Sequence, residues 1–216
     1  MSHLVQDALQ HVTTLFASKL PSTCLYHNLT HTKRVLKSTE EIIDSTNLST
    51  EDIEILELTA VLHDAGYIIG PLEHEIESTK IATEFLKSKD VADTMIQKIN
   101  ECILATRLEA VPKNQLEKII RDADASHFAK DYFEEASELL RLELKMQGIA
   151  SYSKKDWNAE NIEMLTSKHN YYTDYAIQNW NPKKEENLLK SIAYKKLKKK
   201  EDEKESVTLK GGKVRT

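Results

Sequence analysis

The chain has 216 residues and a net charge of −5, and 40% of its residues are hydrophobic while 30% are charged. This composition indicates one soluble globular domain of ordinary size and excludes two large ones. Because charges of both signs are mixed along the chain, we expect no nucleic-acid partner. No apolar run approaches the roughly 20 residues that a membrane-spanning helix requires.

The cysteines and the N-terminus favour a cytoplasmic protein. The two cysteines, Cys24 and Cys102, lie inside helix-like patterns, and the first residues, MSHLVQDALQ, lack a basic segment followed by an apolar one. These features are typical of a chain kept in a reducing compartment. Only five glycines are present, two of them at 211 and 212, which favours helices over hairpins.

Helical periodicity runs along most of the chain, with breaks near Pro21, Pro112, Gly148 and Pro182. From Lys183 the sequence is helix-prone at first and then almost entirely charged. We therefore expect a helical domain over residues 1–195 and a charged, flexible tail or connector over 196–216. The predicted helices cover about residues 3–19, 28–45, 50–63, 75–88, 91–107, 114–127, 130–147 and 154–179.

The segment VLHDAGYIIG ends the third predicted helix with two adjacent polar side chains. Leu56, Ala60 and His63 share one face at helical spacing, so His63 extends the buried stripe. Neighbouring residues on a helix diverge by about 100°. His63 and Asp64 can therefore converge on one ion only if the helix stops there, and Gly66 offers the break.

Two further segments supply partners. YHNLTHTKRVL places His27 and His31 four residues apart, so both can line one side of a helix start, although a buried core imidazole is the alternative for either one. In LEKIIRDADASHF, Asp124 follows the apolar stripe, whereas Asp122 falls with Lys118 on the polar face. A buried carboxylate such as Asp124 needs a cation or a strong donor nearby.

Two imidazoles and two carboxylates, with no thiolate, suit a divalent ion that keeps open positions for water. A catalytic site is therefore favoured over a closed structural zinc site. The pattern His31, His63-Asp64 and Asp124 resembles the HD-domain metal-dependent phosphohydrolase superfamily. That resemblance implies an all-α bundle of about seven to nine helices in which these four residues hold Mn2+, Mg2+, Fe2+, Ni2+ or Zn2+.

Longer segments, including EHEIESTKIATEFL and HNYYTDYAIQNW, resemble one bacterial branch of that superfamily, the cytosolic domain ahead of a membrane-embedded segment in Pycsar-type antiphage effectors. This resemblance implies that the tail connects to a membrane-embedded part beyond residue 216. YHNLTH also resembles the motif of class I cyclic-nucleotide phosphodiesterases, which implies that His27 is the general acid and His31 a ligand. The chain departs from the superfamily at Ala125-Ser126, where many members have Arg-Leu, and at Thr106-Arg107, where a further histidine would be sought, so we expect one ion with a second left open.

The implied reaction is hydrolysis of a phosphate ester of a nucleotide or related small molecule by a metal-activated water. Asp64 or Asp124 would bridge the metal and the water, while His27 protonates the leaving oxygen. Positive side chains are candidates for holding the phosphate, and two residues near the loop after Asp64 are candidates for contacting substrate or metal. These candidates are Lys33, Arg34 and Arg107 for the phosphate, and His74 and Glu75 for the substrate.

Each of these assignments has an alternative. Lys33 and Arg34 fit ordinary helix-surface charges, and His74 with Glu75 fits a plain helix start. His127 and His169 are expected either in the core or beside the site residues that they support, and Tyr171 and Tyr172 are expected as packing residues. The whole chain also fits a nucleotide-sensing module with little or no turnover, because the fold does not decide between the two functions. Substrate identity and homo-oligomerisation stay open.

Overall fold

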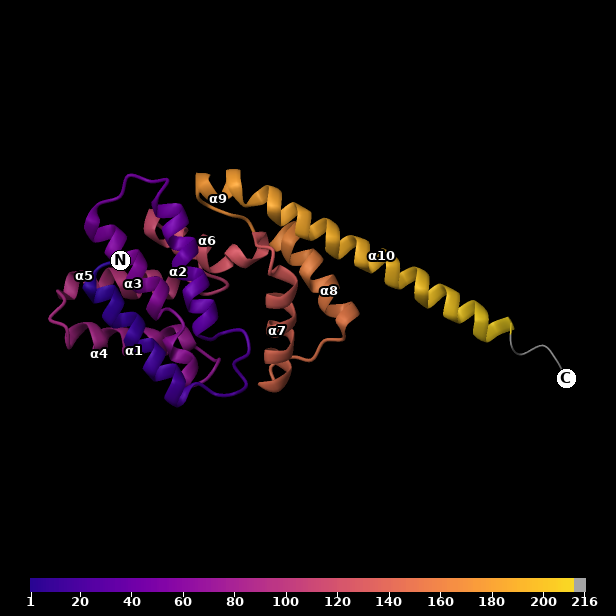
Figure 1. Cartoon of the computed structure of the whole chain (residues 1–216), viewed down its shortest axis with the longest axis horizontal. Helices are drawn as coiled ribbons and strands as arrows, with labels where there is room; N and C mark the ends of the chain where they lie inside the picture. The colour runs from indigo at the N-terminus through magenta and orange to yellow at the C-terminus, as the bar shows by residue number, and fades with distance from the viewer. Residues whose placement is uncertain (212–216) are drawn as a thin grey trace.

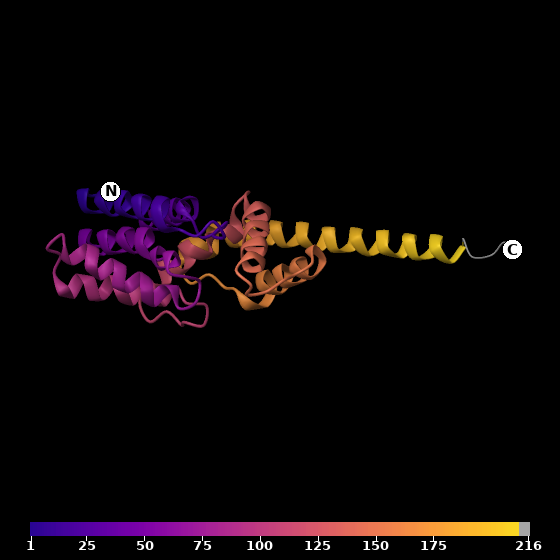
Figure 2. The same ribbon diagram turned by 90° about the horizontal axis from the view of Figure 1, so that it is seen from below.

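The computed structural model describes the backbone of residues 1–211 and the side chains of residues 1–200 (Figures 1 and 2). Over that range the chain contains helices and turns only, which confirms the predicted all-α class. It has ten α-helices, one more than the upper end of the predicted range. They are α1 His3–Lys19, α2 Leu29–Ile43, α3 Thr50–Leu62, α4 His74–Lys87, α5 Asp93–Ala105, α6 Gln115–Asp124, α7 Phe133–Met146, α8 Lys154–Glu163, α9 Asp174–Asn179 and α10 Asn181–Gly211.

Helix α3 forms the centre of the bundle. It packs against α1, α2, α4, α5 and α6, and every residue from Ile55 to Leu62 is buried. Ser49 caps its N-terminus by accepting from the N–H of Asp52 at 3.1 Å. Because the helix is surrounded, the two polar residues at its C-terminal end, His63 and Asp64, are also enclosed by protein.

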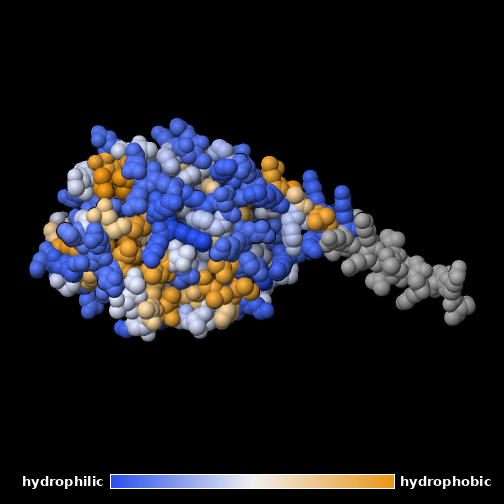
Figure 3. Space-filling model, viewed as in Figure 1, coloured by the Kyte–Doolittle hydropathy of each residue, from blue (hydrophilic) through white to orange (hydrophobic). Residues whose placement is uncertain are grey.

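The outer surface fits this arrangement. In the view of Figure 3 the body is mostly hydrophilic, with separate apolar patches between charged areas. The large apolar side chains are concentrated in one core, which runs through α1 to α6 and also takes in Tyr171 and Trp180. The helices that follow α6 pack on one end of this body, and α10 extends away from it (Figures 1 and 2).

The predicted helix over 154–179 is wrong. Helix α8 ends at Glu163, a π-helical turn follows over Met164–Lys168, and the chain is extended at Thr173 before α9 begins. The prediction that Asp122 lies on the polar face is wrong as well, because Asp122 is only 1% exposed. Its carboxylate accepts from Tyr172 N at 3.0 Å, Thr173 N at 2.7 Å and Thr173 Oγ1 at 2.7 Å. These bonds satisfy backbone N–H groups that would donate within the helix if it were continuous. They therefore account both for the burial of Asp122 and for the break in the helix before Thr173.

Helix α10 passes through the predicted domain boundary at residue 195 without interruption. Its first turns are attached to the body, because Lys184 donates to His169 O at 2.6 Å and Asn187 donates to Phe128 O at 3.0 Å. The predicted separate tail over 196–216 stays a prediction, and residues 212–216 lie outside the described residues. None of the helices within residues 1–211 has the length and apolar character needed to cross a bilayer.

Candidate metal centre

Four side chains from three separate elements meet near the C-terminal end of α3. His31 lies in the first turn of α2, where Asn28 caps the helix by accepting from Thr30 N at 2.8 Å. His63 and Asp64 follow the last residue of α3, and Asp124 is the last residue of α6. The contacts of α3 with α2 and α6 bring these helix ends together.

The turn after Asp64 depends on Gly66 for a reason that the sequence did not reveal. Gly66 lies in a 3-10 turn, Ala65–Ile68, and its N–H donates to Ser78 Oγ at 2.8 Å. A Cβ on Gly66 would lie 2.0 Å from the carbonyl oxygen of His74 and 2.7 Å from Ser78 N. Glycine is therefore required for the close approach of this turn to α4, which also sets the position of His74.

The ligand atoms of the four residues face one another at short range. Asp64 Oδ2 lies 3.3 Å from His31 Nε2 and 3.2 Å from His63 Nε2. Asp124 Oδ1 lies 3.1 Å and 3.7 Å from the same two nitrogens. Neighbouring ligands around an ion with bonds of about 2.1 Å are separated by roughly 3 Å, so this spacing fits a single divalent cation.

Three of these atoms lack hydrogen-bond partners although they are buried, namely His31 Nε2, His63 Nε2 and Asp64 Oδ2. His63 Nδ1 lies 3.0 Å from the carbonyl oxygen of Ala60, which accepts its proton and leaves Nε2 with a lone pair in the neutral ring. A lone pair that faces a carboxylate oxygen is repulsive unless a positive charge lies between them. The donor set therefore fits a metal ion.

The electrostatics of the site agree with this geometry. Burial alone lowers the pKa of an imidazole, but Asp64 and Asp124 outweigh burial and raise the pKa of His63 well above its ordinary value. Burial raises the pKa of Asp64, yet His63 and His31 outweigh it and hold that pKa well below the usual range. The carboxylates thus attract positive charge to this point, which protons or a divalent cation can supply.

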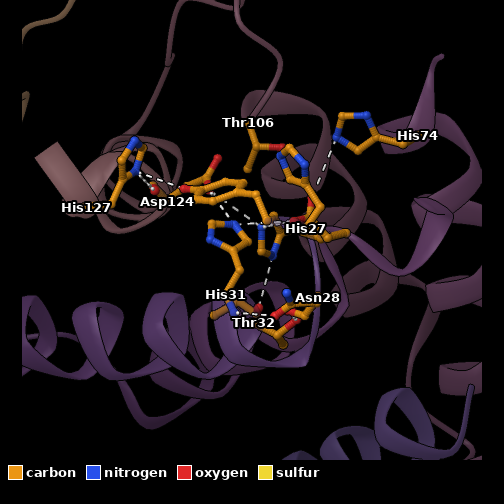
Figure 4. Close-up of polar contacts among 12 residues, drawn as sticks. His27, Asn28, His31, Thr32, His74, Thr106, Asp124 and His127 are labelled. Atoms are coloured by element: carbon orange, nitrogen blue, oxygen red, sulfur yellow. Dashed lines mark hydrogen bonds and ion pairs between the residues drawn. The ribbon is translucent and has the colours of Figure 1, made fainter. Parts of the chain in front are cut away.

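His27 lies beside the four ligands and is held by a residue that the sequence analysis missed. Its Nδ1 pairs with Glu143 of α7, and its ring stacks on Tyr67 with centroids 4.2 Å apart. Among the described residues no hydrogen bond or ion pair uses His27 Nε2, which leaves this nitrogen for a bound molecule. Figure 4 shows His27, His31 and His74 gathered around the same region as Asp124.

Glu143 could have been found by periodicity. Residues 133, 136, 140 and 143 follow helical spacing, and Phe133, Ala136 and Glu143 are all buried in the structure. A carboxylate on such a stripe needs a strong donor. Burial raises the pKa of Glu143, but hydrogen bonds from His27 and from the N–H groups of Tyr26 and His27 outweigh burial and lower it.

His74, Glu75 and Arg107 form a polar border next to the ligands. His74 Nε2 lies 3.6 Å from Asp64 Oδ1 and 3.6 Å from Glu75 Oε1. Glu75 Oε2 lies 3.8 Å from Arg107 Nε. Arg121 fixes the segment that carries Arg107, because its guanidinium donates to Ala105 O at 2.7 Å and to Arg107 O.

The remaining candidates lie apart from the four ligands. Arg34 rests over the ring of Tyr132 at 3.8 Å and lies 3.6 Å from Glu135, and Lys33 is exposed. Within the described chain neither cation contacts a ligand residue, so their predicted roles at the phosphate stay predictions.

The other two histidines that the sequence singled out differ in their distance from the ligands. His127 lies next to them, with Nδ1 3.3 Å from the carbonyl oxygen of Asp124 and 3.0 Å from the Tyr26 hydroxyl, and burial lowers the pKa of His127 to about 4. Burial also lowers the pKa of His169, next to Lys184, to about 3. Both therefore stay neutral near pH 7. Both side chains are half-buried rather than in the core, and His127 contacts a ligand residue.

Comparison with protein families identifies the part of the chain that carries this geometry. Residues 28–129 match the HD domain family. This region is an HD domain. It contains all four ligand residues, whereas His27 and Glu143 lie outside it. HD domains are typically metal-dependent phosphohydrolases that bind divalent ions.

No curated protein and no solved structure matches the chain. The resemblance to Pycsar-type effectors stays a prediction.

Proposed function

We propose that the chain is a metal-dependent phosphohydrolase that hydrolyses a phosphate ester of a nucleotide or related small molecule. The observation that carries the proposal is the meeting of three buried, unpartnered ligand atoms, His31 Nε2, His63 Nε2 and Asp64 Oδ2, with Asp124 Oδ1. A divalent ion held there would supply an activated water and polarise a phosphoryl oxygen. Its identity among Mn2+, Mg2+, Fe2+, Ni2+ and Zn2+ is left to experiment.

His27 is the proposed general acid. Its ring lies 5.6 Å from that of His31, centroid to centroid, so it is beside the reaction centre without being among the four ligands. Glu143 accepts from Nδ1 and stabilises the imidazolium, which leaves Nε2 to protonate the leaving oxygen. Stacking on Tyr67 fixes the plane of the ring.

Arg107 is the proposed phosphate contact. Its side chain is 37% exposed and is joined to the centre through Glu75 and His74, whose imidazole lies 3.6 Å from Asp64. A substrate oxygen can compete with Glu75 for the guanidinium, because that ion pair is long at 3.8 Å. His74 and Glu75 would then contact the substrate from the same border.

The test uses the full chain, purified and analysed for metal content. Mn2+, Mg2+, Fe2+, Ni2+ and Zn2+ are each combined with nucleoside mono-, di-, tri- and cyclic phosphates, and released phosphate or nucleoside is measured. We expect turnover with at least one ion, and its loss in Asp64→Asn. A folded Asp64→Asn protein that keeps full turnover would refute the proposed site.

A sensor is the second candidate function, and α10 supports it. This helix begins against the HD domain and continues to Gly211, so it could carry a nucleotide-dependent change to a partner or to a membrane-embedded part of a longer protein. Figure 1 shows it leaving the body as a single rod. Saturable nucleotide binding without turnover under every metal would favour the sensor over the enzyme.

A further inference from the structure

A cavity of about 430 Å3 lies between α7, α8 and α10, outside the HD domain. Helices α8 and α10 pack against each other, and Figure 1 shows α7 beside them. A volume of this size lies in the lower range of small-molecule sites. The candidate metal centre uses none of the residues that line this cavity.

The lining combines aromatic rings with fixed polar groups. Phe133, Trp157 and Tyr194 supply the rings, and Asn158 and Asn161 supply the amides. Aromatic walls with a few placed hydrogen-bonding groups are typical of sites for planar, polar molecules. The cavity thus offers aromatic side chains on which a planar ring can pack, and amide groups that can form hydrogen bonds with the edge of that ring.

Hydrogen bonds hold the amides in one orientation. Asn158 Nδ2 donates to the carbonyl oxygen of Ser191 at 3.0 Å, and Asn161 Nδ2 donates to Ser137 Oγ at 2.7 Å. Trp157 Nε1 donates to Ser137 O at 2.9 Å, which ties the indole to the same point. Within the described chain no hydrogen bond reaches the Oδ1 atom of Asn158 or Asn161, so the two amides present acceptors. A matching ligand must bring N–H donors.

The charges of the lining argue against a phosphate group. Three carboxylates, Asp131, Glu134 and Glu138, stand against two lysines, so the cavity has a net negative charge. Glu138 is already paired, because the guanidinium of Arg141 donates to it at 2.8 Å and Lys154 Nζ lies 4.0 Å away. Lys190 keeps its charge, since its Nζ donates to the neutral Asn187 Oδ1 at 3.2 Å, so one lysine of the lining stands against the carboxylates of Asp131 and Glu134. An anion would therefore meet a negative balance of charge.

We propose that this cavity binds a nucleoside through a base that carries an exocyclic amino group. The amino group supplies the N–H donors for the asparagine oxygens, the ring packs among the aromatic side chains, and the absence of a phosphate avoids the carboxylates. Helix α7 separates this site from the metal centre. Ser137 lies about 120° around the helix axis from Glu143, given 100° per residue, so the two residues point to different sides.

Binding is tested on the full chain by isothermal titration calorimetry with adenosine and with purine riboside, which lacks the amino group and adds no other N–H donor. We expect adenosine to bind with a Kd on the order of 100 µM, as its size allows, and purine riboside to bind at least about tenfold more weakly because the hydrogen bonds of the amino group are lost. Quenching of Trp157 fluorescence should follow adenosine binding, while Trp180, buried at 4% exposure, provides a constant background. The background is measured in Trp157→Phe.

Variants separate the cavity from other sites. Asn161→Leu should weaken adenosine binding at least tenfold, while Asn179→Leu, an exposed asparagine of α9 outside the cavity, should leave it unchanged. Asp124→Asn should also leave it unchanged, since the metal centre is not involved. If Asn161→Leu fails to fold, Tyr194→Ala at the partly exposed rim replaces it. Absence of saturable adenosine binding at millimolar concentration, or equal affinity in the cavity variants, would overturn the proposal.

Discussion

Glu143 of α7 pairs with His27 across 116 positions of the chain, and it is only 1% exposed. The same carboxylate accepts the N–H of Tyr26 at 2.7 Å and of His27 at 3.1 Å. One buried acid therefore fixes both the backbone and the ring of His27. It joins a helix outside the HD domain to the residue that precedes the HD domain in sequence.

Replacing Glu143 by Gln should slow hydrolysis by about 10- to 100-fold, since a general acid contributes at least that much to such a step. The amide no longer holds the imidazolium of His27 in place, so the loss should fall on kcat and leave KM little changed. The measurement is kcat and KM on the best substrate, with bound metal determined in parallel. Glu134→Gln, an exposed position on the same helix, is the control and should leave kcat unchanged. A folded Glu143→Gln protein with an unchanged kcat would rule out this role.

Asp124 and Asp122 form a matched pair for testing metal binding. Asp124→Asn should reduce bound metal from about one ion per chain to nearly none, because loss of a direct ligand exceeds the 10- to 100-fold cost of losing an outer contact. Asp122→Asn should keep the metal, since its carboxylate is bonded to Tyr172 and Thr173. Elemental analysis after dialysis measures both variants.

The variants Asp122→Asn and Asp124→Asn also distinguish the effect of losing the metal from a general loss of folding stability. Asp122→Asn should lower the free energy of unfolding by about 1–3 kcal/mol, because part of a buried acceptor for three donors is lost. A chelator such as EDTA should lower the melting temperature of wild-type protein but not that of Asp124→Asn. Equal chelator effects on the two proteins would place the ion elsewhere.

Helical periodicity and the residue pattern were sufficient for the all-α class, the first seven helices and the meeting of His31, His63, Asp64 and Asp124. They were insufficient where the local structure depends on a hydrogen bond to a residue far away in the sequence. The break at Thr173 follows from hydrogen bonds to Asp122, some fifty positions earlier in the chain, and no local pattern shows these bonds. Asp122 appeared to face water for the same reason, since its partners come from outside its own helix.

The role of Glu143 shows a second limit. Its burial follows from helical spacing, but its partner, His27, lies more than a hundred residues away, and only the packing of α7 brings them together. Gly66 shows a third limit of prediction from the sequence. The helical pattern predicts that Gly66 ends a helix, whereas the structure requires glycine there for the close approach of the turn to His74 and Ser78. Close approach between backbones leaves no sign in composition or periodicity.

Gly66→Ala should therefore be strongly destabilising. The new methyl group would meet the backbone oxygen of His74 at 2.0 Å, so α4 or the turn must move. We expect a loss of about 3 kcal/mol or more of unfolding free energy, in the range of severe overpacking. Urea unfolding measures it, and Gly148→Ala is an informative comparison, because Gly148 has open space around it and its positive φ of 70° is the only strain. A Gly66→Ala protein as stable as wild type would show that the turn can shift freely.

The stability of the chain should fall in mild acid, partly through His169. Burial and the nearby Lys184 lower the pKa of His169 to about 3, from 6.5 in the unfolded chain. The unfolded state therefore binds the proton first as the pH falls below about 6.5, and the folded state is destabilised progressively down to about pH 3. Between pH 7 and pH 5 this one group should remove at most about 2 kcal/mol.

His169→Gln checks that contribution, since glutamine keeps a polar side chain but does not titrate. Urea unfolding at pH 7 and pH 5 gives the loss for each protein, and the loss should be smaller in the variant by up to about 2 kcal/mol. The carbonyl of residue 169 still accepts from Lys184 in the variant, so the attachment of α10 is retained. Equal losses in the two proteins would mean that His169 is protonated as readily in the folded chain as in the unfolded one.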